Sequence, residues 1–226
     1  MKAVCFDLDG TICDLWEGEG TARIKLIEIL SERTEMESDE VSKLYDTKWA
    51  NIKRNYMGWV AKGMDEVDIR EKHMNDVFEI LGLETGARQL AELHCKTTMD
   101  GIIIYPDARS VLESMGEKHR LCMITNGPPD WQREKLEKLD ITKYFEEIIV
   151  SGEIGHHKPS PKIFNEMTQR MGVDPSEIIY IGNDYWKDIV GANGAGWKTA
   201  WVNRQGQEIE YVDPTYIIKE LSELYL

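Results

Sequence analysis

The sequence has no long hydrophobic run, and no stretch approaches the ~18 consecutive apolar residues that a membrane-spanning helix needs. No basic head, apolar segment and cleavage site precede the first apolar run, so we expect no secretory signal and a cytoplasmic location. Cysteine is scarce, and the four cysteines have neither CxxC nor zinc-ligand spacing: Cys5, Cys13, Cys95 and Cys122. We therefore expect reduced thiols rather than a disulfide framework or a zinc site.

Basic residues are also few, with 27 Lys and Arg against 41 Asp and Glu and a formal net charge of −14. Nucleic acids and anionic membranes bind basic surfaces, so the composition predicts neither as a partner. A small phosphate ligand remains compatible, because a metal ion, one lysine and a few backbone amides can create a local positive field. The hydrophobic share of 42% is enough for a globular protein with a sizeable core.

The first ten residues combine an apolar strand with two acids. Ala3 to Phe6 is typical of a strand buried on both faces in a parallel sheet. Asp7 and Asp9 follow directly, and side chains two residues apart on an extended chain point to the same side. Two like charges at a buried strand end call for a cation or fixed donors between them, which suggests a divalent metal ion. The alternative is an ordinary turn, because Asp and Gly10 are both turn residues.

The segment from Asp14 to about Met99 shows no convincing strand, whereas its apolar residues recur at helical spacing. Four such faces predict four packed helices: Ile24, Ile27 and Leu30; Val41, Tyr45, Trp49, Ile52 and Tyr56; Val67, Met74, Val77, Phe78 and Leu81; Ala87, Leu90 and Leu93.

After Gly101, short apolar runs alternate with amphipathic stretches, which predicts a βαβ array with a parallel sheet. The predicted strands are Leu121 to Ile124, Ile148 to Val150, Ile178 to Ile181 and Thr199 to Val202; the predicted helices are Asp107 to Lys118, Trp131 to Leu139, Pro161 to Met171 and a closing helix from Thr215 to Leu226. The first strand must join this sheet, because alone its backbone groups would be unpaired. We therefore expect an α/β core of residues 1–13 and 100–226 and a helical insertion of residues 14–99.

Three further polar motifs follow predicted strands. Thr125 and Asn126 stand at a strand end before a glycine turn, where a phosphate could find donors, although a plain turn is the alternative. Lys158 precedes Pro159, which restricts its backbone and suits a fixed point charge. An exposed lysine is the alternative there, and we expect the adjacent His156 and His157 to be surface residues.

The third motif is Gly-Asn-Asp at the end of the strand Ile178 to Ile181. Asp184 could coordinate a metal ion, with Asp188 one helical turn further on and Asn183 behind it. The alternative is that Asp184 or Asn183 only caps the following helix.

These motifs, in this order and spacing, resemble those of the haloacid dehalogenase-like hydrolase superfamily. The quoted residues are Asp-x-Asp-Gly-Thr at 7–11, Thr125-Asn126, Lys158-Pro159 and Gly-Asn-Asp-x-x-x-Asp at 182–188. More narrowly, Gln132, Lys135-Leu136 and Glu153 are similar to the branch with nucleotide and sugar phosphatases. The resemblance implies a Rossmann-like parallel sheet with an inserted four-helix cap.

The resemblance also implies a mechanism that uses Mg²⁺. Asp7 would be the nucleophile that accepts the phosphoryl group, and Asp9 the general acid and then base. Asp7, the backbone carbonyl of Asp9 and Asp184 would hold Mg²⁺, with Asn183 and Asp188 behind them. Thr125, Asn126 and Lys158 would bind the phosphoryl oxygens. Many members carry the acid one position earlier, where this chain has Asn183.

The expected reaction is hydrolysis of a small phosphomonoester, such as a nucleotide or sugar phosphate. A sugar-phosphate mutase of the same superfamily, a receiver-like phospho-acceptor module and an inactive scaffold are the alternatives. An acid at Asp9 counts against the dehalogenases and phosphonate hydrolases. Candidate specificity residues of the helical insertion are Trp49, Lys53, Arg54 and Trp59, although core or surface roles are the better interpretation of the sequence.

Overall fold

The computed structural model describes residues 1–225, and these fall into two compact units. One unit combines Met1–Asp14 with Ile103–Leu226, and the other is Leu15–Ile102. Within the described residues, no helix is both long and apolar enough to cross a membrane.

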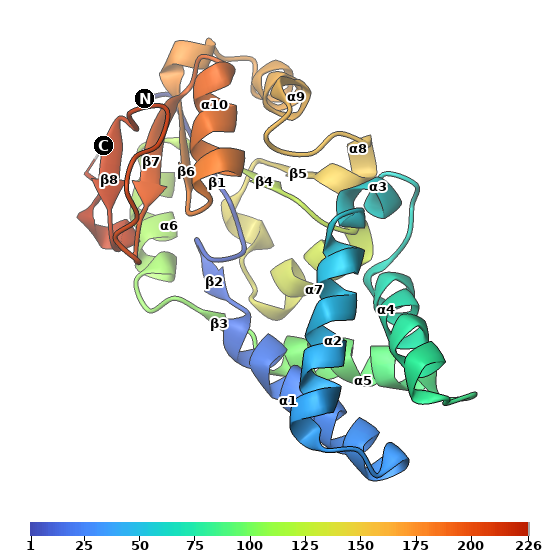
Figure 1. Cartoon of the computed structure of the whole chain (residues 1–226). Helices are drawn as coiled ribbons and strands as arrows, with labels where there is room; N and C mark the ends of the chain where they lie inside the picture. The colour runs from blue at the N-terminus through green and yellow to red at the C-terminus, as the bar shows by residue number, and fades with distance from the viewer. Residues whose placement is uncertain (226) are drawn as a thin grey trace. The chain divides into compact units, whose positions relative to one another are not determined.

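The first unit contains a six-stranded parallel sheet (Figure 1). The strands, in spatial order, are β5 (Glu147–Val150), β4 (Arg120–Thr125), β1 (Ala3–Phe6), β6 (Ile178–Gly182), β7 (Lys198–Val202) and β8 (Tyr216–Ile218). β1 lies inside the sheet, where Cys5 is opposite Cys122 on one side and Tyr180 on the other. All four residues of β1 are fully buried, as expected for an apolar strand that is covered on both faces.

Helices connect the strands and pack against the sheet. The helices of the unit are α6 (Ala108–Gly116), α7 (Pro129–Lys138), α8 (Ser151–Ile154), α9 (Pro161–Met171) and α10 (Gly191–Gly194). The apolar side of α9 packs on β1, β4, β5 and β6 through Ile163, Phe164 and Met167. A small antiparallel pair, β2 (Cys13–Asp14) and β3 (Ile103–Ile104), lies where the chain leaves and re-enters this unit.

The predicted parallel sheet is confirmed, but the predicted closing helix is wrong. The chain instead forms β8, which pairs with β7 in parallel, and then a short 3₁₀ turn at Leu221–Glu223. Ile217 and Ile218 are β-branched, and only Ile218 is buried, which suits an edge strand. The last predicted helical residue, Leu226, lies outside the described residues.

The second unit is all-helical. Its helices are α1 (Trp16–Thr34), α2 (Ser38–Lys53), α3 (Tyr56–Val60), α4 (Glu66–Leu81) and α5 (Ala87–Asp100). Four of them are the predicted long helices, and α3 is an additional short one. Ile24 was assigned to the buried face of α1, but its side chain is 57% exposed, because Ala22, Leu26 and Leu30 form that face. α1 and α5 approach closely at Gly18, where an added Cβ would lie 2.3 Å from the Thr98 carbonyl oxygen.

Candidate active site

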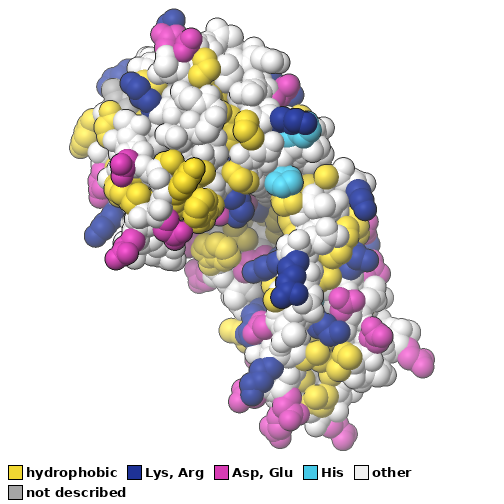
Figure 2. All heavy atoms as spheres, turned by 45° about the horizontal axis from the view of Figure 1, so that its top comes forward, with side chains coloured by type: hydrophobic (Ala, Val, Ile, Leu, Met, Phe, Trp, Pro, Cys, Tyr) yellow, Lys and Arg dark blue, Asp and Glu magenta, His cyan; other side chains and the backbone are white. Residues whose placement is uncertain are grey.

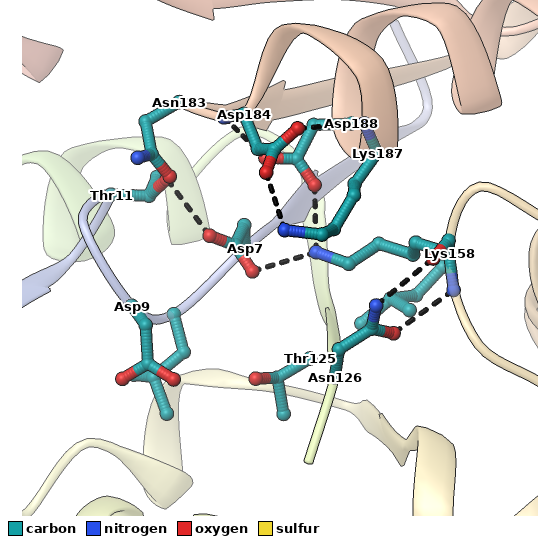
Figure 3. A network of polar contacts seen from close by, with 12 residues as sticks. Asp7, Asp9, Thr11, Thr125, Asn126, Lys158, Asn183, Asp184, Lys187 and Asp188 are labelled. Atoms are coloured by element: carbon teal, nitrogen blue, oxygen red, sulfur yellow. Dashed lines mark hydrogen bonds and ion pairs between the residues drawn. The ribbon is translucent and has the colours of Figure 1, made fainter. Parts of the chain in front are cut away.

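The loops after β1, β4 and β6, together with the loop before α9, bring the predicted polar residues into one network (Figure 3). This placement follows from the topology, because the carboxyl ends of parallel strands meet at one edge of the sheet. The labelled side chains are Asp7, Asp9, Thr11, Thr125, Asn126, Lys158, Asn183, Asp184, Lys187 and Asp188.

Asp7 is buried at the end of β1, with 6% of its surface exposed. Its Oδ1 atom accepts a hydrogen bond from Lys158 Nζ at 2.7 Å, and its Oδ2 atom accepts one from Thr11 Oγ1 at 3.2 Å. Burial raises the pKa of Asp7 to about 7, although the neighbouring Lys158 acts in the opposite direction. A carboxylate with this environment is fixed in position and strongly perturbed, which is typical of a functional residue.

Lys158 is buried rather than exposed, so the alternative of a solvated lysine is wrong. Its Nζ atom donates to Asp7 Oδ1 and Asp188 Oδ1, each at 2.7 Å, and to Tyr180 Oη at 2.8 Å. These three contacts match the three donors of an ammonium group. Burial alone would lower the pKa of Lys158, but the carboxylates of Asp188 and Asp7 outweigh it and hold the pKa above its ordinary value. Lys158 is therefore a fixed positive charge beside Asp7.

Asn126 holds the backbone of Lys158. Its Oδ1 atom accepts from the Lys158 N–H at 2.9 Å, and its Nδ2 atom donates to the Lys158 carbonyl oxygen at 3.0 Å. The side-chain amide of Asn126 thus positions the lysine loop. The predicted role of Asn126 in binding substrate gains no support from these side-chain contacts.

Asp188 is the second carboxylate that contacts Lys158, and it belongs to a π-helical turn at Tyr185–Val190. It is fully buried, and its Oδ2 atom accepts from the Asp184 N–H at 2.9 Å. Burial raises the pKa of Asp188 despite the neighbouring lysine. The position of Asp188 also explains why residue 182 is a glycine, because a Cβ at Gly182 would lie 2.4 Å from Asp188 Oδ2.

Asn183 and Asp184 face different partners. One end of the Asn183 side-chain amide lies 3.0 Å from the Asp9 carbonyl oxygen and 3.3 Å from Asp7 Oδ2. Asp184 instead caps the following turn, where Lys187 contributes a backbone N–H at 2.9 Å and Nζ at 2.5 Å. Burial alone would raise the pKa of Asp184, but the hydrogen bonds from Lys187 outweigh it and lower the pKa. The structure therefore places Asn183, rather than the predicted Asp184, against Asp7 and Asp9.

Oxygen ligands for Mg²⁺ can be tested against these distances. Among residues 1–225, no group of three or more His, Cys, Asp and Glu side chains is arranged to hold a metal ion. The predicted site differs from such a cluster, because it includes a backbone carbonyl. The end of the Asn183 amide that faces this site is the N–H end, which donates to the Asp9 carbonyl oxygen at 3.0 Å; rotating the amide by half a turn would place its oxygen at the same distance. Neighbouring ligands of an octahedral Mg²⁺ are separated by about 3.0 Å, so these groups fit the ion.

Asp9 contacts two residues of α7 whose roles the sequence did not reveal. Lys135 Nζ lies 2.8 Å from each carboxylate oxygen of Asp9, and Gln132 Nε2 lies 3.1 Å from Oδ2. Gln132 also donates to Thr125 Oγ1, which is the other predicted substrate-binding group. In the sequence, both residues belong to the set that resembles the branch with nucleotide and sugar phosphatases, but that resemblance gave neither of them a role.

The remaining candidates are two histidines of the α/β unit and four residues of the helical unit. His156 is exposed and His157 is half-buried. Trp49, Lys53, Arg54 and Trp59 all belong to the helical unit. There Trp49 packs against the guanidinium of Arg70, whose central carbon lies 3.9 Å from the ring centroid, so its side chain has a packing role.

Together, the fold and the site define an α/β enzyme that holds a carboxylate and a lysine at the carboxyl edge of its sheet. A family model of haloacid dehalogenase-like hydrolases matches residues 1–196. The chain therefore belongs to the haloacid dehalogenase-like hydrolase family and is a hydrolase.

Individual proteins are similar over most of the chain. N-acylneuraminate-9-phosphatase of Mus musculus is 27% identical over 231 residues, which cover 99% of this chain and 92% of the mouse protein. Phosphoserine phosphatase of Thermus thermophilus is 33% identical over 160 residues, which cover 70% of this chain and 64% of that protein. The HAD-hydrolase YfnB of Bacillus subtilis, solved bound to magnesium, has a TM-score of 0.76 at 24% identity, with 99% of this chain and 96% of that chain covered. The last similarity supports the shared fold.

Proposed function

We propose that this hydrolase is a Mg²⁺-dependent phosphatase that cleaves a small phosphomonoester through an aspartyl-phosphate on Asp7. The observation that carries the proposal is the buried contact of Asp7 with Lys158, in which a nucleophilic carboxylate is fixed beside a permanent positive charge. The similar proteins named above are phosphatases of N-acylneuraminate 9-phosphate and phosphoserine by their names, which supports the same class of reaction.

In the proposed first step, the Asp7 carboxylate attacks phosphorus and the bond from phosphorus to the leaving oxygen breaks. Lys158 and the Thr125 hydroxyl bind phosphoryl oxygens, where negative charge collects in the transition state. Asp9 gives its proton to the leaving oxygen. In the second step Asp9 takes a proton from water, which attacks the phosphoryl group and frees Asp7.

The proposed metal site consists of Asp7, the Asp9 carbonyl and Asn183. When bound, Mg²⁺ supplies positive charge that offsets the repulsion between the Asp7 carboxylate and the incoming phosphate. The distances around the Asn183 amide favour this residue over Asp184, which pairs with Lys187. Thr11 keeps Asp7 oriented through Oδ2.

A small metabolite is the proposed substrate, and no nucleic acid or membrane is a proposed partner. On the face shown in Figure 2, acidic and basic side chains are interspersed, and no broad basic area gathers there. A net charge of −14 gives such polymers little attraction. The four cysteines, Cys5, Cys13, Cys95 and Cys122, are free and buried, which agrees with a reducing compartment such as the cytoplasm.

Phosphate release tests the proposal directly. Purified protein should hydrolyse p-nitrophenyl phosphate, EDTA should abolish the activity, and added Mg²⁺ should restore it. Asp7→Asn should retain less than about 1% of the rate, a change of ~2.7 kcal/mol in the barrier, because an amide is a poor nucleophile. Full activity in EDTA would contradict the metal site, and an active Asp7→Asn enzyme would contradict the nucleophile.

The substrate class needs a second assay. A panel of phosphorylated sugars, amino acids and nucleotides should release phosphate faster than phosphopeptides of comparable charge. Faster cleavage of phosphopeptides would contradict a small substrate. Isomerised sugar phosphate without stoichiometric phosphate release would instead identify a mutase.

A further inference from the structure

The carboxylate of Asp9 is held by one face of α7. Lys135 and Gln132 are three residues apart on this helix, so their side chains project from the same side. Both are buried, with 2% and 1% of their surface exposed. The side chain of Asp9 is 26% exposed. The two residues of α7 thus anchor a carboxylate that still reaches solvent.

The two contacts differ in kind. Lys135 Nζ is equidistant from both oxygens of Asp9, at 2.8 Å, which fixes the direction in which the carboxylate points. Gln132 Nε2 donates to Asp9 Oδ2 and also to Thr125 Oγ1. A single amide group therefore connects the proposed acid to a proposed phosphoryl-binding hydroxyl.

We infer that Lys135 and Gln132 are positioning residues that fix Asp9 for proton transfer to the leaving group. The inference rests on the proposed function, in which Asp9 is the general acid. A free aspartate side chain samples several staggered rotamers, and donation requires its oxygen within hydrogen-bond reach of the leaving oxygen. Donors on a buried helix face select one of these rotamers, and Gln132 aligns it with Thr125.

This role predicts a dependence on the leaving group. When Asp9 acts, its O–H bond breaks and the proton moves to the leaving oxygen as the P–O bond breaks. An alkoxide needs that proton, whereas nitrophenolate leaves as a stable anion. A residue that positions Asp9 should therefore matter for alkyl phosphates and much less for p-nitrophenyl phosphate.

The test compares kcat/KM for p-nitrophenyl phosphate and for the alkyl ester 2-glycerophosphate, because kcat/KM reports the steps up to release of the leaving alcohol and leaves out the hydrolysis step that both esters share. Lys135→Met should lower kcat/KM for the alkyl ester about 100-fold, a typical scale of general acid catalysis, and lower kcat/KM for the aryl ester by less than about threefold. Gln132→Leu should shift the ratio of the two kcat/KM values in the same direction, by about tenfold.

Three reference variants make the result specific. Lys138→Met removes an exposed lysine of the same helix and should leave both rates unchanged. Lys135→Arg should recover most of the alkyl-ester rate, because a guanidinium can bind both oxygens of a carboxylate. Asp9→Asn should show the same selective loss of kcat/KM as Lys135→Met, together with a lower kcat on both esters because the base of the second step is removed.

Equal losses of kcat/KM on the two esters, or no loss, in both Lys135→Met and Gln132→Leu would overturn the positioning role while an active wild type leaves the proposed function intact. A folded wild type that is inactive on both esters with Mg²⁺ present would overturn the proposed function, and this inference with it.

Discussion

Each of the two units buries one cation between two carboxylates. In the α/β unit, Lys158 lies 2.7 Å from both Asp7 and Asp188. In the helical unit, Arg70 lies 2.6 Å from Glu19 and 2.7 Å from Glu66. Burial alone would lower the pKa of either cation, but the two carboxylates raise it in both. The arrangement of charge is the same, although the positions differ in everything that surrounds them.

The network around Arg70 is closed. Its third nitrogen, Nη1, contacts His94 Nε2 at 3.1 Å, and its face packs on Trp49. The second carboxylate oxygen of Glu66 accepts a hydrogen bond from the Tyr56 hydroxyl. Each polar group named here is occupied by another side chain of the same unit, so the cluster is suited to holding helices together.

The network around Lys158 is not closed in this way. Asp7 has a pKa raised to about 7 and a second oxygen that faces Thr11 and the Asn183 amide. These are weaker contacts at 3.2 and 3.3 Å, which a ligand could replace. The two buried ion pairs therefore differ in one respect: Asp7 has an oxygen without a strong contact, whereas the polar groups around Arg70 are all bound to one another.

Lys158→Met should separate the two networks most clearly. We expect a loss of at least about 1000-fold in kcat/KM, or ~4 kcal/mol, because a fixed charge on the phosphoryl group is removed. Circular dichroism should show a folded protein, and Lys162→Met, at an exposed lysine on α9, is the control. Unchanged kinetics would place Lys158 in the same structural class as Arg70.

Arg70→Met should lower the stability of the protein and leave its kcat nearly unchanged. Removing Arg70 leaves the buried Glu66 and the half-buried Glu19 without their cation, so the free energy of unfolding should fall by about 3 kcal/mol. The kcat of the remaining folded enzyme should change little. Arg88→Met is the matched control, because Arg88 pairs with Asp68 and Glu71 at 44% side-chain exposure and its removal should leave the free energy of unfolding nearly unchanged. A large loss of kcat in folded Arg70→Met would mean that this network also serves catalysis.

The incomplete contacts of Asp7 can be tested through metal affinity. Asn183→Ala should raise the Kd for Mg²⁺ at least about tenfold in calorimetric titration, and Asp184→Ala should raise it less. The reason is that Asn183 faces Asp7 and the Asp9 carbonyl, whereas Asp184 is paired with Lys187. The reverse order would restore Asp184 as the ligand.

The smallest effect concerns pH and the helical unit. His73 is fully buried, its Nε2 contacts the Tyr45 carbonyl oxygen at 2.9 Å, and burial lowers its pKa to about 4. The unfolded chain, with an ordinary histidine pKa of about 6.5, binds this proton first, so stability is lost as pH falls below about 6.5. We expect about 1 kcal/mol less stability at pH ~5.5 than at pH ~7.5 from His73.

A His73→Gln variant provides the comparison for this pH effect. Its free energy of unfolding should depend less on pH over the same range, because the group that takes up the proton is absent. An equally steep dependence in the variant would assign the acid sensitivity to other groups.

The sequence by itself was sufficient for five of the six strands of the sheet and for the main charged residues. Apolar runs that end in polar residues marked β1, β4 and β6, and parallel strands bring such ends together whatever the details of packing. Asp7 could be selected in this way, whereas Lys158 was selected because Pro159 follows it and restricts its backbone. The helical insertion could also be predicted, since the spacing of apolar residues is a local property of the chain.

Other features depended on contacts between distant segments. The chain end at Tyr216–Ile218 forms a strand because β7 offers an unpaired edge, which a local pattern does not report. Asn183 and Asp184 are neighbours of similar chemistry, and only the path of the turn at Tyr185–Val190 decides which one faces Asp7. The local pattern around Lys135 is typical of a solvated lysine, because its burial depends on the packing of α7 beside the loop of Asp9. Local periodicity specifies elements and their ends, whereas the direction of a side chain at those ends is decided by the partners that the tertiary fold supplies.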